Sequence, residues 1–119
     1  MTARLAKLVE LRKAVETRYW GLETTRAAIF LFPGNRENNL VWAAYTDSTD
    51  AALALLKEVL PGVPWSIMFE PEDEGREYQA SMNHHTNDEM RFIHEFAPTL
   101  ARALLLAMLS ALIDRERTG

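Results

Sequence analysis

Three histidines are the side chains of this sequence best suited to bind a metal or to transfer a proton. They lie at positions 84, 85 and 94. Imidazole nitrogens are common zinc ligands, but the ligands of one ion must reach a single point. Neighbours such as His84 and His85 point to opposite sides of a strand, or diverge by about 100° on a helix. Only His94, across a predicted hairpin, could join one of them, so we expect neither a metal site nor a cofactor.

Carboxylates cluster between positions 70 and 77, ahead of these histidines. The cluster consists of Glu70, Glu72, Asp73, Glu74 and Glu77. Carboxylate oxygens suit hard cations, but the acidic spacing and the glycine of a calcium loop are missing. The pattern therefore favours solvated turn charges. A small metal-dependent hydrolase that uses His84, His94 and this acidic turn is the enzymatic alternative.

No other pattern indicates catalysis. Ser48 and Ser66 do not occupy a nucleophile elbow, and the sequence has neither a Walker motif nor a G-x-G-x-x-G motif. We predict no catalytic residue and a protein that is not an enzyme.

Aromatic residues on two predicted strands suggest another alternative, a sheet that binds single-stranded nucleic acid. Trp65, Phe69 and Tyr78 could stack on bases, as the aromatics of RNA-binding sheets do. The formal net charge is −4, whereas nucleic acid and anionic membranes attract basic surfaces. We therefore expect neither partner, and we expect the aromatics to pack in the core.

The bulk composition is that of a single globular domain that spans residues 1–119. The chain is 48% hydrophobic and 25% charged. It has no cysteine, which fits a reducing cytoplasm, and its first residues lack the apolar core of a secretion signal. The longest apolar segment is interrupted by Arg102 and is too short to span a bilayer.

Helical patterns occupy both ends of the chain. Residues 3–18 form an amphipathic helix with Thr2 as its N-cap, and residues 97–115 form a helix that is apolar on nearly all sides, with Pro98 in its first turn. Residues 22–32 could be strand or helix, and their spacing favours a helix, which gives an N-terminal helical segment over residues 3–32. Leu40 to Tyr45 has the pattern of a short extended piece.

The middle of the chain predicts one helix and three strands. Ser48 caps a helix over residues 48–60 that buries Leu53, Leu56 and Leu60 and ends at Pro61-Gly62. Alternating residues predict strands over 65–70, 77–83 and 90–96, the last with Met90, Phe92, His94 and Phe96 on one side, and a polar turn over 84–89. These elements give an α+β fold, a small three-stranded antiparallel sheet sandwiched between helical layers. The helices 48–60 and 97–115 are expected to pack directly on the sheet.

Several short motifs resemble a family of small phage and prophage proteins. Residues 45–53 read YTDSTDAAL, residues 60–62 read LPG, residues 65–67 read WSI and residues 97–104 read APTLARAL. They resemble the phage ABA sandwich domain family, whose pattern has a Y-T-x-S-x-D-A-A-L start, a P-(E)-G turn, a Trp-Ser strand and an A-T-P-A-L-A-L helix. Pro98 and Thr99 are swapped relative to that pattern, and Arg102 departs from it. The resemblance covers about residues 44–113 and implies an α-β-α domain in the cytoplasm of a bacterial host, with no catalytic residues to carry over.

The hypothesis that follows is a non-enzymatic phage or prophage accessory protein that acts by protein–protein interaction or self-association. A helix that is apolar on nearly all sides needs more cover than one small domain provides. We therefore expect a homodimer or a complex with another phage or host protein. The possible interface residues are Arg102, Leu106, Ile113, Trp20 and Trp42.

Overall fold

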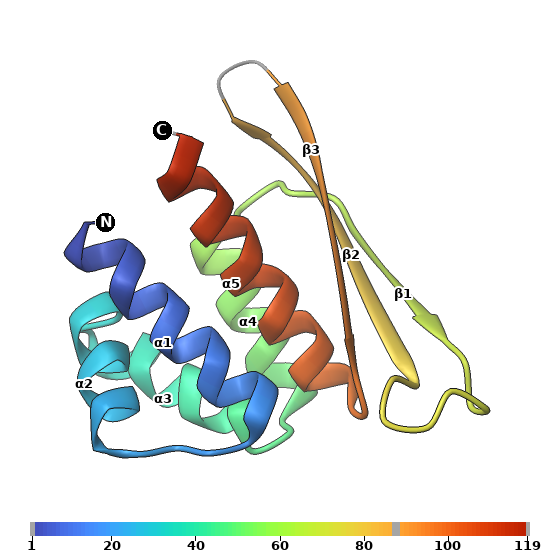
Figure 1. Cartoon of the computed structure of the whole chain (residues 1–119), viewed down its shortest axis with the longest axis horizontal. Helices are drawn as coiled ribbons and strands as arrows, with labels where there is room; N and C mark the ends of the chain where they lie inside the picture. Colours follow the sequence, from blue (N-terminus) through green and yellow to red (C-terminus); the bar gives the residue numbers. More distant parts are fainter. Residues whose placement is uncertain (1, 87–88, 119) are drawn as a thin grey trace.

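The computed structural model describes residues 2–86 and 89–118. Within these ranges the chain forms five helices and one three-stranded sheet (Figure 1). In chain order the elements are α1 (Ala3–Thr17), α2 (Leu22–Leu31), α3 (Asn35–Tyr45), α4 (Thr49–Val59), β1 (Trp65–Phe69), β2 (Tyr78–Thr86), β3 (Glu89–Ala97) and α5 (Leu100–Thr118). The predicted α+β class is confirmed, and so is the three-stranded antiparallel sheet with helices beside it.

The strands run antiparallel in the order β1-β2-β3. Met82 at the centre of β2 lies opposite Trp65 on β1 and Ile93 on β3. Ala80, Met82 and His84 alternate along β2 and are all buried. Because residues paired directly across strands share a face of the sheet, this register defines one inner face that meets the helices and one outer face.

The helices lie on a single side of the sheet (Figure 1). Among the described elements, α5 is the helix that contacts β2 and β3 extensively. α1 and α4 flank α5, with α2 behind α1 and α3 behind α4. The layer order therefore differs from the expected one, in which the sheet lies between helices and α4 packs directly on it. The cause is α5, which is apolar on most sides and draws α1 and α4 onto the flanks that the sheet leaves open.

The predicted boundaries of several helices are confirmed by their caps. Thr2 Oγ1 accepts a hydrogen bond from the Leu5 amide at 3.0 Å, and Ser48 Oγ accepts one from the Ala51 amide at 3.2 Å. Gly62, just past α4, has φ +77°, a conformation that costs little only for glycine. The segment that begins at Leu22 is helical, as its spacing favours.

Other local predictions are wrong. Leu40 to Tyr45 belongs to α3 and is not extended; α3 buries Val41, Ala44 and Tyr45 against the other helices. His84 lies within β2, so the predicted polar turn is largely strand, and its positions 87 and 88 lie outside the described residues.

Two details of the helices also differ from the prediction. α5 begins at Leu100, after Pro98 rather than with it, and Thr99 Oγ1 accepts from the Arg102 amide at 3.3 Å. On α4, Leu55 is buried in place of the half-buried Leu53.

Candidate functional site

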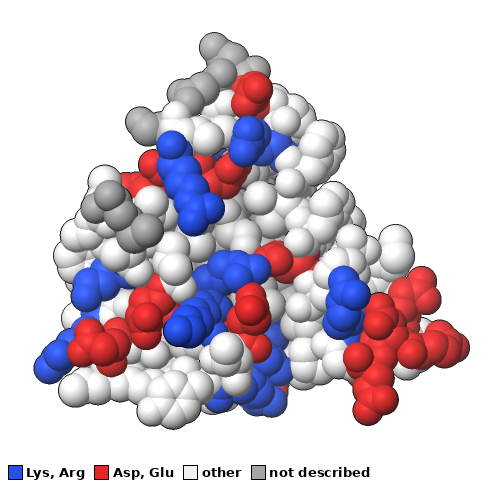
Figure 2. All heavy atoms as spheres, viewed as in Figure 1, with Lys and Arg blue, Asp and Glu red and all other residues white. Residues whose placement is uncertain are grey.

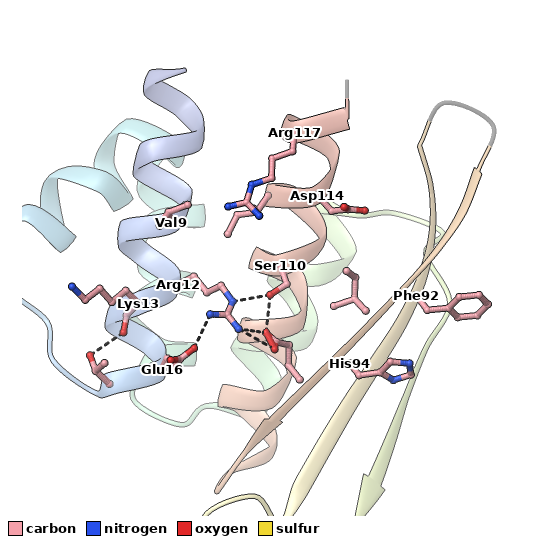
Figure 3. Close-up of a pocket in the computed structure, with 13 residues that line it drawn as sticks. Val9, Arg12, Lys13, Glu16, Phe92, His94, Ser110, Asp114 and Arg117 are labelled. Atoms are coloured by element: carbon pink, nitrogen blue, oxygen red, sulfur yellow. Dashed lines mark hydrogen bonds and ion pairs between the residues drawn. The ribbon is translucent and has the colours of Figure 1, made fainter. Parts of the chain in front are cut away.

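The outer face of the sheet carries three exposed apolar side chains of β3, those of Met90, Phe92 and Phe96. Phe92 and His94 point away from the helices (Figure 3). Their neighbours along the strand, Arg91, Ile93 and Glu95, face α5 and α1. A strand between a core and water normally has the opposite alternation, with charges outside.

Residues from all three strands make up this surface. The outer face consists of Ser66 and Met68 on β1, Gln79, Ser81, Asn83 and His85 on β2, and Met90, Phe92, His94 and Phe96 on β3. Met68, Met90, Phe92 and Phe96 are all exposed. None of these described side chains is a Lys, Arg, Asp or Glu. The strand residues of the outer face therefore combine four exposed apolar side chains with uncharged polar residues and two histidines.

The polar groups at the centre of the outer face are directed at one another. Ser81 Oγ lies 2.9 Å from His94 Nδ1, and Gln79 Nε2 lies 3.4 Å from the same nitrogen. At the end of β3, the Arg76 guanidinium lies 4.0 Å from the centroid of the Phe96 ring, within the range of a cation–π contact. The central polar groups thus have partners within the chain.

The charges of β3 are paired on the inner side instead. Arg91 Nε and Nη2 donate to the two carboxylate oxygens of Asp114 on α5, at 2.9 and 2.8 Å. The Arg91 hydrogen bond outweighs burial and lowers the pKa of Asp114. His84 Nε2 lies 3.2 Å from Asp114 Oδ2, and burial lowers the pKa of His84 although Asp114 opposes that shift. This cluster ties the far end of β3 to α5.

A second polar cluster lies in an open groove of about 760 Å³ between α1, β3 and α5 (Figure 3). Arg12 on α1 donates to Ser110 Oγ at 2.8 Å, to Glu95 Oε1 at 2.9 Å and to Glu16 Oε2 at 2.6 Å. Ser110 in turn donates to Glu95 Oε2 at 2.7 Å. Burial opposes the charge of Arg12, but the hydrogen bonds and charges of Glu95 and Glu16 outweigh it and raise the Arg12 pKa.

This groove cluster joins three elements, α1, β3 and α5. The Ser110 hydroxyl is used by both Arg12 and Glu95, so its hydrogen bonds hold α5 to α1 and β3. In Figure 2 blue and red atoms are mixed over the seam between α1 and α5, as paired charges would be. We interpret the cluster as a structural tether.

The residues proposed for a metal-dependent hydrolase do not come together. His84 faces the helices, whereas His85 and His94 lie on the outer face. The acidic turn joins β1 to β2 at the Tyr78 end of β2, about 20 Å from His84 at strand spacing. Among the described residues, no group of three or more metal-ligating side chains gathers at one point.

The flank of α5 predicted as an interface is buried inside the chain, so that prediction is wrong for three of its residues. Arg102, Leu106 and Ile113 are all buried. Arg102 Nη2 donates to the carbonyl of Val15 at 3.2 Å, in the last turn of α1, where carbonyls lack helical partners and a cation is favourable. Burial and the nearby charge of Arg18 lower the pKa of Arg102.

The two tryptophans of the predicted interface form an aromatic cluster with Tyr45. The Trp20 ring lies 5.1 Å from Trp42 and 4.8 Å from Tyr45, between centroids. Trp42 is half-exposed and Tyr45 is buried, so the cluster closes the end of the core near α2 and α3. It lies on α3 and on the segment between α1 and α2, and not on the outer face.

The aromatics proposed to stack on bases lie on the inner side of the register. Trp65, Phe69 and Tyr78 share the face of Met82, and Phe69 and Tyr78 contact each other at 4.8 Å between centroids. Trp65 and Phe69 are exposed at the edge beyond α5, so the expectation that they pack in the core is wrong for these two residues.

Comparisons with protein-family models, with curated proteins and with solved structures found no match. Across residues 2–86 and 89–118, none of the helices has both the length and the apolar character needed to cross a membrane.

The sequence contained the signal for the outer face, but sequence reasoning did not recognise it. The alternation of Met90, Phe92, His94 and Phe96 was visible, and so was that of Arg91 and Glu95. Only the partners of those charges on α1 and α5 show which row faces inward.

Proposed function

We propose that the protein acts by binding a protein partner through the outer face of its sheet, without catalysis. One observation carries this proposal: β3 turns Arg91 and Glu95 toward the helices and Met90, Phe92 and Phe96 toward water. Exposed contiguous apolar surface usually marks a site of interaction.

The composition of the outer face supports a protein partner. The cores of protein interfaces are depleted in charge and enriched in aromatic residues and methionine. Phe92, Phe96, Met68 and Met90 meet that description. Acidic residues gather over the β1–β2 loop, at one end of the sheet (Figure 2), where they can form part of a polar rim.

A phage or prophage setting for this role is supported by the resemblance of residues 44–113 to the phage ABA sandwich family. The genes beside its own test the setting. Phage structural, lysis or replication genes would support it, and an unrelated chromosomal neighbourhood would contradict it.

The binding role is tested by cross-linking in the cells that carry the gene. A photoreactive phenylalanine analogue replaces Phe92, which is 63% exposed on the outer face, or Phe30, which is 52% exposed on α2 and serves as the matched control. We expect a discrete adduct at position 92, identified by mass spectrometry, and several-fold less at position 30. No adduct at position 92, or equal adducts at both positions, would contradict the proposal.

A further inference from the structure

We propose that the partner on the outer face is a second copy of the chain, stacked sheet to sheet about a two-fold axis. This inference rests on the proposed function and names its partner. The charge distribution of the outer face supports this partner. The strand residues of two identical faces bring no Lys, Arg, Asp or Glu into the contact, and Arg76 from the β1–β2 loop lies over the Phe96 ring at one end of the face. A charged partner surface would instead lose its hydration with nothing opposite to replace it.

The charges of the chain lie where two stacked copies would tolerate them. The net charge of −4 makes copies repel one another, but the acidic cluster lies in the β1–β2 loop, at the end of the sheet (Figure 2). At such a rim, water and salt screen the repulsion. The inner charges Arg91 and Glu95 are neutralised by Asp114 and Arg12 and stay on the far side of the sheet.

Some of the polar atoms at the centre of the outer face can also be covered at low cost. Burying a donor or acceptor is expensive when it loses water and gains no partner. Ser81, Gln79 and His94 already contact one another at the centre of the face. A second copy can therefore displace water from Ser81 Oγ and His94 Nδ1 at low cost, while Gln79 Oε1 and His94 Nε2 need hydrogen bonds from the other copy.

The size of the outer face predicts a weak dimer. β3 has nine residues, so it extends about 30 Å at 3.3 Å per residue. Three strands about 4.8 Å apart make the face roughly 10–14 Å wide, or about 400 Å² in plan. That is about half of the 800 Å² per partner of a standard interface. Aligned sheets that stack about 10 Å apart could bury it completely, and we expect a dissociation constant in the micromolar range.

Sedimentation velocity of the purified chain from about 1 µM to about 1 mM tests this inference over the range in which weak interfaces dissociate. We expect the mass to rise from one chain toward two. Phe92→Glu and, independently, Met90→Glu should weaken association at least about tenfold, because each places a charge at the buried centre or end of the apolar row. Phe30→Glu, the matched change on α2, should associate like the wild type, and circular dichroism should show that all variants keep their helices.

Two outcomes overturn the inference. One is a mass of one chain at every concentration, and the other is a dimer that Phe30→Glu disrupts while Phe92→Glu and Met90→Glu do not. The cross-linking experiment then separates the two proposals. An adduct of position 92 with a different protein leaves the proposed function standing without the second copy, whereas no adduct at position 92 rejects both.

Discussion

The two faces of the sheet differ in the side chains that the same three strands place on them. The inner face carries Arg91 and Glu95 of β3, and each has a partner on a helix, Asp114 for Arg91 and Arg12 for Glu95. The outer face carries aromatic and methionine side chains that none of the described helices covers. Along β3, aromatic and methionine side chains are therefore exposed, whereas charged side chains face the helices. The polar groups of the inner face stabilise the fold through contacts with the helices. The outer face stays available for a partner.

The largest expected difference in stability is between substitutions of two methionines, one on each face of the sheet. Met82 on the inner face is 1% exposed and Met90 on the outer face is 48% exposed. Met82→Ala should lower the free energy of unfolding by about 2–5 kcal/mol, because it leaves a cavity beneath α5. Met90→Ala should change it by less than about 0.5 kcal/mol at a concentration where the chain is monomeric. Urea denaturation measures both, and equal losses would show that the faces do not differ as described.

The next largest difference in stability is expected between substitutions of two neighbouring residues of β3 that point in opposite directions. Glu95→Gln removes the charge that Arg12 and Ser110 bind, so it should cost about 1–3 kcal/mol of unfolding free energy. His94→Gln replaces a side chain of the outer face and should cost less than about 0.5 kcal/mol. Thermal unfolding checks the pair. A larger loss for His94→Gln would mean that the groove cluster is not the tether that we describe.

Much of the fold could be predicted because its signals are local. Side-chain caps at Thr2 and Ser48 begin α1 and α4, and the left-handed glycine at Gly62 follows α4. Alternating residues separated by turns gave the strands and their antiparallel order. These features depend on a few adjacent residues and not on the rest of the chain.

The features that could not be predicted depend on packing between distant segments. α3 buries only the narrow stripe of Val41, Ala44 and Tyr45, and its N-cap Gly34 has no side chain to mark its start. We expected the flank of α5 to need a partner because the sequence does not show how much of its apolar surface the other helices bury. Likewise, only Asp114 and Arg12, far from β3 in sequence, decide which row of β3 faces inward.

A smaller effect is the pH dependence of stability that His84 on the inner face causes. Burial lowers the pKa of His84 below its ordinary value of 6.5, with Asp114 favouring its protonated form and Arg115 and Arg91 opposing it. Above pH 6.5 the imidazole is neutral in both states and contributes no pH dependence. As the pH falls below 6.5 the unfolded chain binds a proton that the folded chain does not, so stability declines by at most about 1.4 kcal/mol per pH unit.

His84→Gln should remove this decline between about pH 6.5 and 5, since glutamine does not titrate there. The Asp114 carboxylate acts in a lower window, because its pKa is lowered from 3.8 and its contribution is lost as pH falls through that range. Phe92→Thr on the outer face is the control, because it changes no titrating group. Chemical denaturation at several pH values should show the wild-type slope in Phe92→Thr and a flatter one in His84→Gln, and identical slopes in all three proteins would contradict the burial of His84.

Phe92→Thr is expected to have the smallest effect on the stability of the monomer. It also tests most directly whether the outer face, unlike the inner one, is free to bind a second copy. Phe92 is exposed, and threonine suits a strand, so the unfolding free energy of the dilute chain should change by less than about 0.5 kcal/mol. A partner that binds only the folded state adds stability that grows with its concentration. The wild type should therefore melt at a higher temperature as protein concentration rises, because a second copy covers its outer face. Phe92→Thr should lose most of that dependence while it keeps the melting temperature of the dilute chain. Calorimetry at low and high concentration measures both quantities in one protein. If the variant is much less stable when dilute, Phe92 belongs to the fold; if neither protein responds to concentration, the apolar face is not covered by a second copy.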